Sequence, residues 1–298
     1  MLLSNKGITL SRLLGILGLL KPVSSFFIGL ASFAAFCGAS PRDPRPGWWL
    51  LLGICFLAGG CSAVNQWQES DLDALMARTR GRPLPSGRVG RGFALCLGLF
   101  FFVAGLSILC LKQPWIVTAM GLAGATWYNL IYTPLKARNG LAAFPGTLPG
   151  CLLPMLGWEA AGKIPDAVPA LLVLGFSGLW QIVHVALLCI WWEEDHENSP
   201  NPNLYKALGY RGVTLLAATG MIGTGGLAVV LQLNDLMKSQ AGAAIFRGFS
   251  LALLIMGFAV LFEKPSSEAR RGIFIAWHLW LGVGLLLVIF GYFSEPHG

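Results

Sequence analysis

Charged residues are scarce in this sequence. Asp, Glu, Lys and Arg make up only 12% of its 298 residues, whereas a soluble globular domain carries about 25%. Hydrophobic residues make up 55%, and they gather in runs that are long enough to cross about 30 Å of hydrocarbon as helices. The scarcity of charge therefore excludes an ordinary soluble domain and predicts a polytopic membrane protein.

The patterns of several other protein classes are also missing. No run of segments alternates in hydrophobicity like the strands of a transmembrane β-barrel. The seven cysteines form no C-x-x-C pair, and we interpret them as small apolar residues rather than as metal ligands. We find no sequence repeat, P-loop, zinc-protease motif or nucleophile elbow, and the N-terminus does not resemble a cleaved signal peptide.

Nine apolar segments have the length of a membrane-spanning helix. They cover residues 14–37, 47–67, 91–111, 114–133, 141–161, 168–192, 212–233, 243–262 and 272–293. The sequence therefore predicts an all-α fold, a bundle of nine transmembrane helices that forms a single integral-membrane domain over residues 1–298. Residues 1–13 are expected to form a short interfacial helix.

The Lys and Arg residues of the short loops predict the orientation. One side of the nine-span topology holds Lys6, Arg12, Arg78, Arg80, Arg82, Arg88, Arg91, Lys136, Arg138, Lys206, Arg211, Lys264, Arg270 and Arg271, and the other holds Arg42, Arg45, Lys112, Lys163, Lys238 and Arg247. Because cytoplasmic loops carry the excess, we expect the first side to face the cytoplasm. No organelle transit peptide is evident, so we expect the plasma (inner) membrane of a bacterium or archaeon. This bias explains most of the net charge of +7, and nucleic acid is not an expected partner.

The most informative segment is Asn65–Gly87, NQWQESDLDALMARTRGRPLPSG, which begins at the end of an apolar run. Asn65, Glu69 and Asp73 are four residues apart, so they share one face of a helix, whereas Asp71 points to nearly the opposite face. Amide and carboxylate oxygens suit Mg²⁺, whose shell is usually completed by a substrate phosphate. The alternative is a polar helix end that solvates itself at the membrane surface.

Arginines follow this row of oxygen ligands at once, at Arg78, Arg80 and Arg82. A guanidinium binds phosphate oxygens through charge-assisted hydrogen bonds. An acidic row next to a basic loop at a membrane surface therefore predicts a site for a metal-bridged diphosphate.

A second segment, WYNLIYTPLKARNG, covers Trp127–Gly140. Tyr132 lies where an aromatic belt is expected, and Pro134 is expected to end the helix. Lys136 and Arg138 then project on the same side as the arginines of the first segment. They are interpreted as phosphate ligands, with an ordinary positively charged cytoplasmic loop as the alternative.

A third segment, LWQIVHVALLCIWWEEDHEN, covers Leu179–Asn198. Gln181, His184 and Asp195 share one helical face, with about 16 Å along the helix between the last two. An ionisable residue such as His184 inside the bilayer is a candidate functional residue, with a packed imidazole as the alternative. Asp195 and the neighbouring Glu194 belong to a second acidic cluster, which with the first row can hold two or more Mg²⁺ around one diphosphate.

Two further features concern the later spans. Pro145, Pro149 and Pro154 predict an irregular fifth span, of the kind that lines a cavity. His278, in the last span, is interpreted as an interfacial residue, with a place in the cavity wall as the alternative.

These three segments resemble the UbiA superfamily of intramembrane prenyltransferases, and within it they are most similar to the heme O synthase (protoheme IX farnesyltransferase) family. The first block, N-Q-W-x-E-x-x-x-D…M-x-R-T-x-x-R-P-L-x-x-G, is matched from Asn65 to Gly87. The second, Y-T-P-L-K, is matched from Tyr132 to Lys136, and the third, L-W-Q-x-P-H-F-x-A-L…E-D-Y, is matched in part from Leu179 to His196. Two departures lie near the expected acceptor side and the second metal motif, where Val183-His184-Val185 stands for Pro-His-Phe and Asp195-His196 for Asp-Tyr.

The resemblance implies a helical bundle around a cavity that opens to the cytoplasm and laterally to membrane lipid. It implies an isoprenyl diphosphate donor, farnesyl diphosphate for a heme O synthase, and heme b as the acceptor that becomes heme O. The catalytic residues would be Asn65, Glu69, Asp73 and Asp195, which with Glu194 would hold Mg²⁺ or Mn²⁺. The substrate-binding residues would be Arg78, Arg82, Tyr132, Lys136, Gln181 and His184, the last of which would orient or ligate the acceptor.

Three other functions remain open at the level of the sequence. One is a UbiA-type enzyme with a phenolic, quinone-precursor or lipid acceptor, which the departures on the acceptor side favour. Another is a catalytically silent protein that binds heme or an isoprenoid. The third is a transporter whose acidic row is an ion site, although such proteins often contain two repeated halves, which are not evident here.

Overall fold

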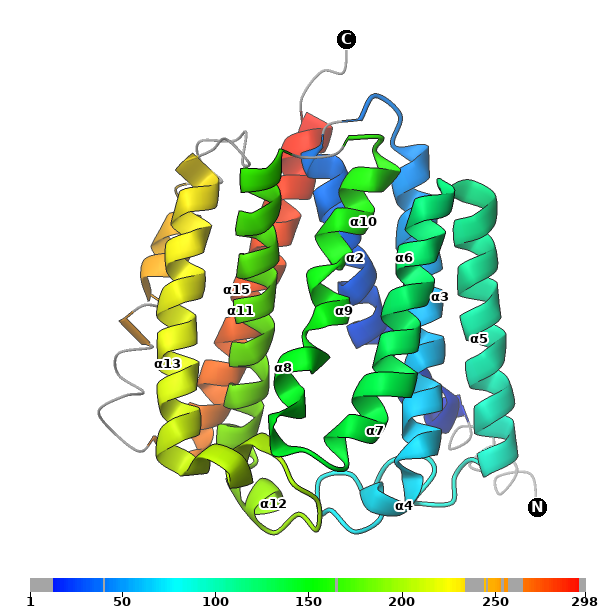
Figure 1. The fold of residues 1–298 in the computed structure, drawn as a ribbon, viewed down its shortest axis with the longest axis vertical. Helices are drawn as coiled ribbons and strands as arrows, with labels where there is room; N and C mark the ends of the chain where they lie inside the picture. The colour runs from blue at the N-terminus through cyan, green and yellow to red at the C-terminus, as the bar shows by residue number, and fades with distance from the viewer. Residues whose placement is uncertain are drawn as a thin grey trace, which may run out of the picture.

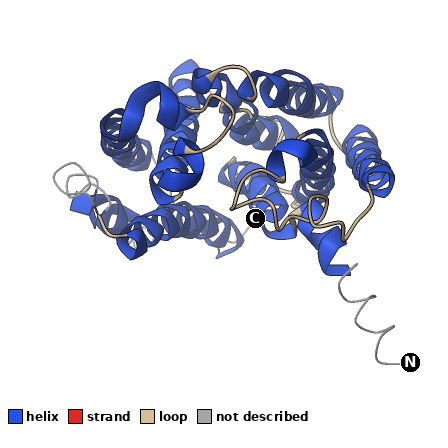
Figure 2. Ribbon diagram, turned by 90° about the horizontal axis from the view of Figure 1, so that it is seen from below, coloured by secondary structure: helices blue, strands red, loops and turns tan. Residues whose placement is uncertain are grey.

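The computed structural model describes residues 13–39, 41–163, 166–233, 244, 246–252, 255–256 and 265–294. Every regular element within these residues is a helix, as Figures 1 and 2 show. A helix satisfies its own backbone hydrogen bonds, so it suits an apolar chain in lipid. The predicted interfacial helix lies outside the described residues, except for its last residue.

The longer helices run alongside one another through the bundle (Figure 1). They are α2 (Pro22–Gly38), α3 (Arg45–Gln68), α5 (Arg91–Lys112), α6 (Trp115–Thr126), α10 (Leu153–Ala160), α11 (Ala167–Trp191), α13 (Leu204–Leu233) and α15 (Ser267–Ser294). Short elements connect them: α4 (Ser70–Asp73), the π-helix η1 (Trp127–Tyr132), α7 (Thr133–Lys136), the 3₁₀-helix η2 (Gly140–Ala142), α8 (Ala143–Gly146), α9 (Leu148–Cys151) and α12 (Glu193–Glu197). Of these, α4, α7 and α12 lie at the same end of the bundle, the lower end of Figure 1.

Seven helical segments of the described chain are long and apolar enough to cross a membrane. They are Leu13–Gly38, Arg45–Gln68, Arg91–Lys112, Gly140–Ala160, Ala167–Trp191, Leu204–Leu231 and Ser267–Ser294. The predicted span 114–133 is present as the consecutive elements α6, η1 and α7. The predicted span 243–262 falls for the most part on residues outside the description. The structure thus confirms a polytopic all-α protein, and the count of nine spans stays a prediction.

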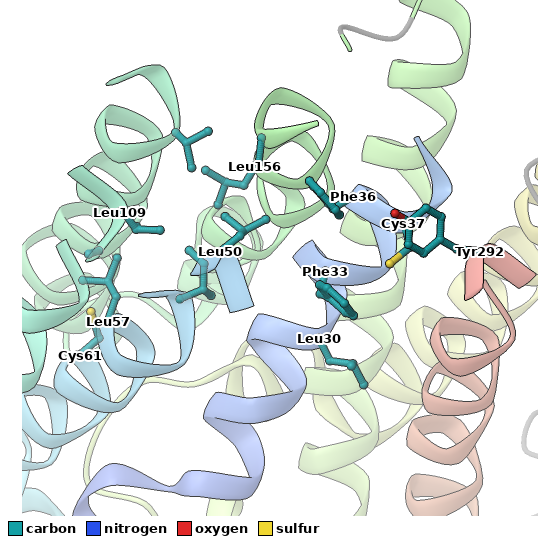
Figure 3. Close-up of a cluster of buried hydrophobic side chains, with 14 residues drawn as sticks. Leu30, Phe33, Phe36, Cys37, Leu50, Leu57, Cys61, Leu109, Leu156 and Tyr292 are labelled. Carbon is teal, nitrogen blue, oxygen red and sulfur yellow. The ribbon is translucent and has the colours of Figure 1, made fainter. Parts of the chain in front are cut away.

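Close packing of α3 on α5 builds one part of the core. A Cβ atom added to Gly60 would lie 2.4 Å from the backbone nitrogen of Phe102, and one added to Gly105 would lie 2.5 Å from that of Leu57. Glycines at these positions let the two backbones approach each other, which drives helix association in lipid. Figure 3 shows the adjoining cluster, in which Leu50 and Leu109 are fully buried.

Proline breaks the fifth predicted span into short helices, as the sequence predicts. Pro149 and Pro154 each lie within the first two positions of a new helix, α9 and α10, where a proline without an N–H is tolerated. A Cβ on Gly150 would lie 1.7 Å from Nε2 of Gln181 on α11. The broken segment therefore leaves room for polar side chains between α9 and α11.

The expectation that Pro134 ends its helix is wrong. The helical path continues to Lys136, because the six residues before Thr133 adopt π-helical pairing. The hydroxyl of Thr133 also donates a hydrogen bond of 2.9 Å to the carbonyl oxygen of Tyr128. The changed register accommodates the missing N–H of Pro134, and such π-helical turns are frequent at functional sites.

Candidate functional site

The acidic row lies where α3 passes into α4. One continuous helix was expected, but α3 ends at Gln68 and Glu69 has φ −94° and ψ 4°. The backbone hydrogen bonds still connect residues four apart, from Glu69 N to Asn65 O at 2.9 Å and from Asp73 N to Glu69 O at 2.8 Å. Asn65, Glu69 and Asp73 are therefore all buried, whereas Asp71 is exposed and pairs with Arg91 at 2.6 Å.

Each buried carboxylate of the row is paired with a cation from another segment. Nζ of Lys136, at the end of α7, lies 2.9 and 3.2 Å from the two carboxylate oxygens of Glu69. Nη1 of Arg82, in the loop after α4, lies 2.9 and 2.7 Å from the two oxygens of Asp73. The structure thus brings the predicted metal ligands and the predicted phosphate ligands together as mutual counterions.

Asn65 is held in place by the first residue of α7, which follows the π-helical turn. Its side-chain nitrogen donates a hydrogen bond of 3.1 Å to the hydroxyl of Thr133. No described residue donates to its side-chain oxygen. With the nitrogen engaged, Asn65 presents a neutral oxygen donor next to the two carboxylates.

Asp195 reaches the same end of the bundle by a different path from the one expected. It does not continue the helix of His184, because α11 ends at Trp191 and Trp192 has φ −104° and ψ 44°. Three acidic residues in the first turn favour the start of a new helix, α12. Oδ2 of Asp195 accepts a hydrogen bond of 2.8 Å from the backbone nitrogen of Arg78.

Glu193, the residue before the predicted ligands Glu194 and Asp195, anchors the start of α12 to two other helices. Glu193 accepts a hydrogen bond of 2.9 Å from the hydroxyl of Tyr205 and pairs with Arg270 at 2.7 Å. Glu194, by contrast, is exposed, and the structure does not bring it to the acidic row. Among the described residues, no three His, Cys, Asp or Glu side chains are grouped closely enough to hold a metal ion by themselves.

Arg78 is a buried cation with unused hydrogen-bonding capacity. Its Nε is buried and has no hydrogen-bond partner in the described part of the chain. Burial and the neighbouring Arg82 lower the pKa of Arg78, but a guanidinium stays charged at neutral pH. A buried donor without a partner is costly, and an anion bound beside Arg78 would satisfy it.

An apolar cavity of about 780 Å³ lies inside the bundle. Residues of α2, α3, α6, α11 and α15 and of the broken segment α8–α10 line it. Its few polar wall residues are Lys21, Ser24, Ser25, Ser62, Tyr128, Ser177, Gln181, His184 and His278. The acidic row does not itself line the cavity, but Lys21 in the cavity wall is close enough to interact electrostatically with Glu69, Asp73, Arg82 and Lys136. We call the acidic row, its paired cations and Lys21 the mouth, a polar region next to a largely apolar cavity.

Lys21 is a site residue that the sequence reasoning missed. It has φ 44° and ψ 60°, and it is the only described residue other than glycine with a positive φ. The left-handed conformation costs an ordinary residue roughly 1–2 kcal/mol. No ion pair or hydrogen bond to its ammonium group is present in the described residues. The signal was the Lys-Pro pair that interrupts the first apolar run.

The predicted acceptor residues lie in or near the cavity wall. Gln181 lines it and donates a hydrogen bond of 3.2 Å to the carbonyl oxygen of Thr147. His184 lines it too, and its Nδ1 lies 2.8 Å from Nε2 of His278. His278 is thus part of the cavity wall rather than an interfacial residue. Tyr132 packs against Gly146, and its neighbour Tyr128 lines the cavity instead.

The family model and the most similar relatives point to the same protein family. Residues 25–279 match the UbiA prenyltransferase family. The chain is 30% identical to a Korarchaeum cryptofilum protein named protoheme IX farnesyltransferase, over 87% of this chain and 88% of that protein. It is 37% identical to a Geobacter sulfurreducens protein of the same name over 56% of this chain. That alignment spans 61% of the Geobacter protein, and a similar one spans 46% of a Nitratidesulfovibrio vulgaris relative.

Solved structures share the fold at low sequence identity. A structure of digeranylgeranylglyceryl phosphate synthase has a TM-score of 0.69 and 15% identity, over 95% of this chain and 99% of that chain. A UbiA homolog from Archaeoglobus fulgidus, solved with DMAPP and Mg²⁺, has a TM-score of 0.66 and 16% identity, over 92% and 98%. At these identities the likeness concerns the fold alone.

Proposed function

Because this chain belongs to the UbiA prenyltransferase family, we propose that it transfers a farnesyl group from farnesyl diphosphate to heme b and so forms heme O. The observation that carries the proposal is the pairing of buried carboxylates with cations close to Lys21, in the wall of an apolar cavity. The charged mouth suits a diphosphate and the cavity suits its isoprenyl chain. Similarity to proteins named protoheme IX farnesyltransferase supports the acceptor.

The residues at the mouth fit a hard divalent cation. Asn65, Glu69, Asp73 and Asp195 offer only oxygen donors, which suit Mg²⁺ or Mn²⁺ rather than a softer metal. In this proposal the cation takes the carboxylates while the diphosphate takes the guanidinium and ammonium groups. Each charge then exchanges one counterion for another. No buried charge is left unpaired, and this matters because an unpaired buried charge is strongly destabilising. The metal ion, when bound, supplies positive charge next to the leaving diphosphate.

The chain's own cations assist the breaking of the carbon–oxygen bond. Arg78, Arg82 and Lys136 stabilise the negative charge that develops on the diphosphate as it leaves with the bonding electron pair. The allylic cation that remains is kept from water by the apolar cavity. The terminal carbon of a heme vinyl group attacks this cation and forms the new carbon–carbon bond. Water then adds to the other vinyl carbon and loses a proton, which completes a hydroxyethylfarnesyl chain.

The proposed location follows from the charge distribution. The acidic row lies at the end of the bundle whose loops carry the excess of Lys and Arg. We therefore place the mouth of the cavity on the cytoplasmic face of the plasma membrane, where a water-soluble diphosphate head group can reach it.

A different acceptor is the second candidate. Val183 and Val185 flank His184 where the resembled family has proline and phenylalanine, so the acceptor side of this chain is not that of the usual heme O synthase. A phenolic, quinone-precursor or lipid acceptor would use the same donor site and the same cleavage chemistry.

The test is the product formed by the purified protein in lipid nanodiscs. The protein is supplied with farnesyl diphosphate, Mg²⁺ and either heme b or a panel of phenolic acceptors, and the products are identified by mass spectrometry. We expect heme O from heme b and none from an Asp73→Asn variant. A prenylated phenol with no heme O would overturn heme as the acceptor, and no product from any acceptor would overturn the enzymatic function. Geranyl and geranylgeranyl diphosphates in parallel assays measure the preferred chain length.

A further inference from the structure

Two histidines from distant parts of the chain meet in the cavity wall. His184 lies on α11 and His278 on α15, and both line the cavity. Nδ1 of His184 is 2.8 Å from Nε2 of His278, and the two rings meet edge to face with centroids 4.9 Å apart. The hydrogen bond joins two helices across 94 residues of sequence.

The partners of the pair determine where its protons lie. Nδ1 of His278 is 2.7 Å from the carbonyl oxygen of Phe274. A carbonyl oxygen only accepts, so Nδ1 of His278 carries the proton. In a neutral imidazole the other nitrogen is then an acceptor, so Nε2 of His278 accepts from Nδ1–H of His184. Inside an apolar bundle the neutral forms are favoured, because an unpaired charge there is costly.

This arrangement leaves His184 with one free lone pair, on Nε2. Nε2 has no hydrogen-bond partner within the described residues, and the side chain is only partly buried because it borders the cavity. The ring of Trp180 stacks on His184 with centroids 5.8 Å apart, and the ring of Phe274 lies 5.5 Å away. The imidazole is therefore held in one orientation by packing as well as by its hydrogen bond.

We propose that His278 is a positioning residue that fixes His184 as the Nδ1–H tautomer, so that Nε2 of His184 serves as a neutral axial ligand for the iron of the acceptor heme. This inference rests on the proposed function, since it assumes a heme acceptor. A metal-ligating histidine usually donates its other N–H to a fixed acceptor, which sets the ring orientation and raises the basicity of the ligand nitrogen. In this chain the hydrogen-bond acceptor for Nδ1–H of His184 would be a second imidazole, that of His278.

The first test determines the tautomer of His184 by nuclear magnetic resonance in the absence of heme. The protein is labelled with ¹⁵N-histidine, and the His184 signals are identified by their loss in a His184→Gln variant. We expect a protonated Nδ1 and an unprotonated Nε2 in the wild type and a mixture of tautomers in His278→Leu. His196→Gln, which removes a histidine outside the cavity, is the matched control and leaves these signals unchanged. A single unchanged tautomer in folded His278→Leu would overturn the proposal.

The second test reads the iron ligand by absorbance and electron paramagnetic resonance during titration with ferric heme. We expect His278→Leu to weaken heme binding by roughly 10- to 100-fold, the usual effect of losing such a partner, and to shift the Soret band. His278→Gln, which keeps an acceptor oxygen, should restore much of the affinity. Thermal unfolding confirms that each variant is folded.

The outcomes separate this inference from the proposed function. Heme binding that is the same in wild type and in folded His278→Leu would overturn the positioning role and leave the proposed acceptor intact. A wild-type protein that binds no heme would overturn both the ligand role and the proposed acceptor. A loss of heme affinity in His278→Leu that His278→Gln reverses is the result we expect.

Discussion

At the scale of single residues, the site is built from acids and bases that neutralise one another. Glu69 pairs with Lys136 and Asp73 pairs with Arg82, and both carboxylates are buried. Such ion pairs are a weak source of stability, because the cost of removing each carboxylate from water offsets much of its attraction to a cation that is itself partly exposed. The pairs are better explained by a ligand that carries both signs of charge, such as a metal–diphosphate complex.

Asp73 and Asp71 form a matched pair for testing this site. Both lie on α4, but Asp73 is 3% exposed and binds Arg82, whereas the side chain of Asp71 is 83% exposed. We expect Asp73→Asn to abolish prenyl transfer and Asp71→Asn to leave the rate within about twofold, because an exposed ion pair contributes little. Initial rates of product formation check this. Equal losses in the two variants would exclude the buried row as the site.

Replacement of Lys21 should have opposite effects on stability and on donor affinity. Lys21 is partly buried, it lies near the cations Arg82 and Lys136, and its ammonium group has no hydrogen-bond or ion-pair partner among the described residues. Lys21→Met should therefore raise the melting temperature of the ligand-free protein. The same change removes one charge-assisted contact, worth about 1.5–3 kcal/mol, so the affinity for farnesyl diphosphate should fall roughly 10- to 100-fold. Thermal unfolding and donor titration measure the two effects. A variant that binds the donor as tightly as wild type would show that Lys21 lies outside the donor site.

At the scale of helices, the sequence predicts the elements better than it predicts their breaks. Apolar runs locate the long helices, and the prolines locate the short helices of the fifth span. The turns at Glu69 and Trp192 could not be predicted, because no glycine or proline marks either break in the sequence. The same holds for the pair His184 and His278, since hydropathy indicates that both helices cross the membrane but not which of their faces meet.

Gly150 tests whether the broken segment positions the acceptor wall. A Cβ atom at this position would lie 1.7 Å from Nε2 of Gln181, so Gly150→Ala should displace Gln181 and lower the acceptor affinity. Gly226→Ala on α13 is the control, since nothing lies within 4 Å of its added Cβ, and alanine there should stabilise the helix by roughly 0.5–1 kcal/mol. Acceptor titration of both variants checks the difference. Unchanged acceptor affinity in Gly150→Ala would remove Gln181 from the acceptor wall.

At the scale of the whole molecule, the bundle separates a charged mouth from an apolar interior. Much of this plan could be predicted from the sequence, because the acidic row, the basic loop and the apolar runs are each contiguous. The counterion pairing could not, since Lys136 is 67 residues from Glu69 and only the packing of the π-helical turn brings them together. We infer that these paired charges together form one binding site for a metal–diphosphate complex.

Thermal unfolding of the purified protein with farnesyl diphosphate, in Mg²⁺ and in a chelator, measures whether the paired charges bind such a complex. A ligand at 100 times its Kd stabilises the folded protein by about 2.7 kcal/mol. We predict a higher melting temperature with donor and Mg²⁺ together, in wild type and in Asp71→Asn, and no shift with donor in chelator or in Asp73→Asn. An equal shift by the donor in the presence of chelator would contradict the account.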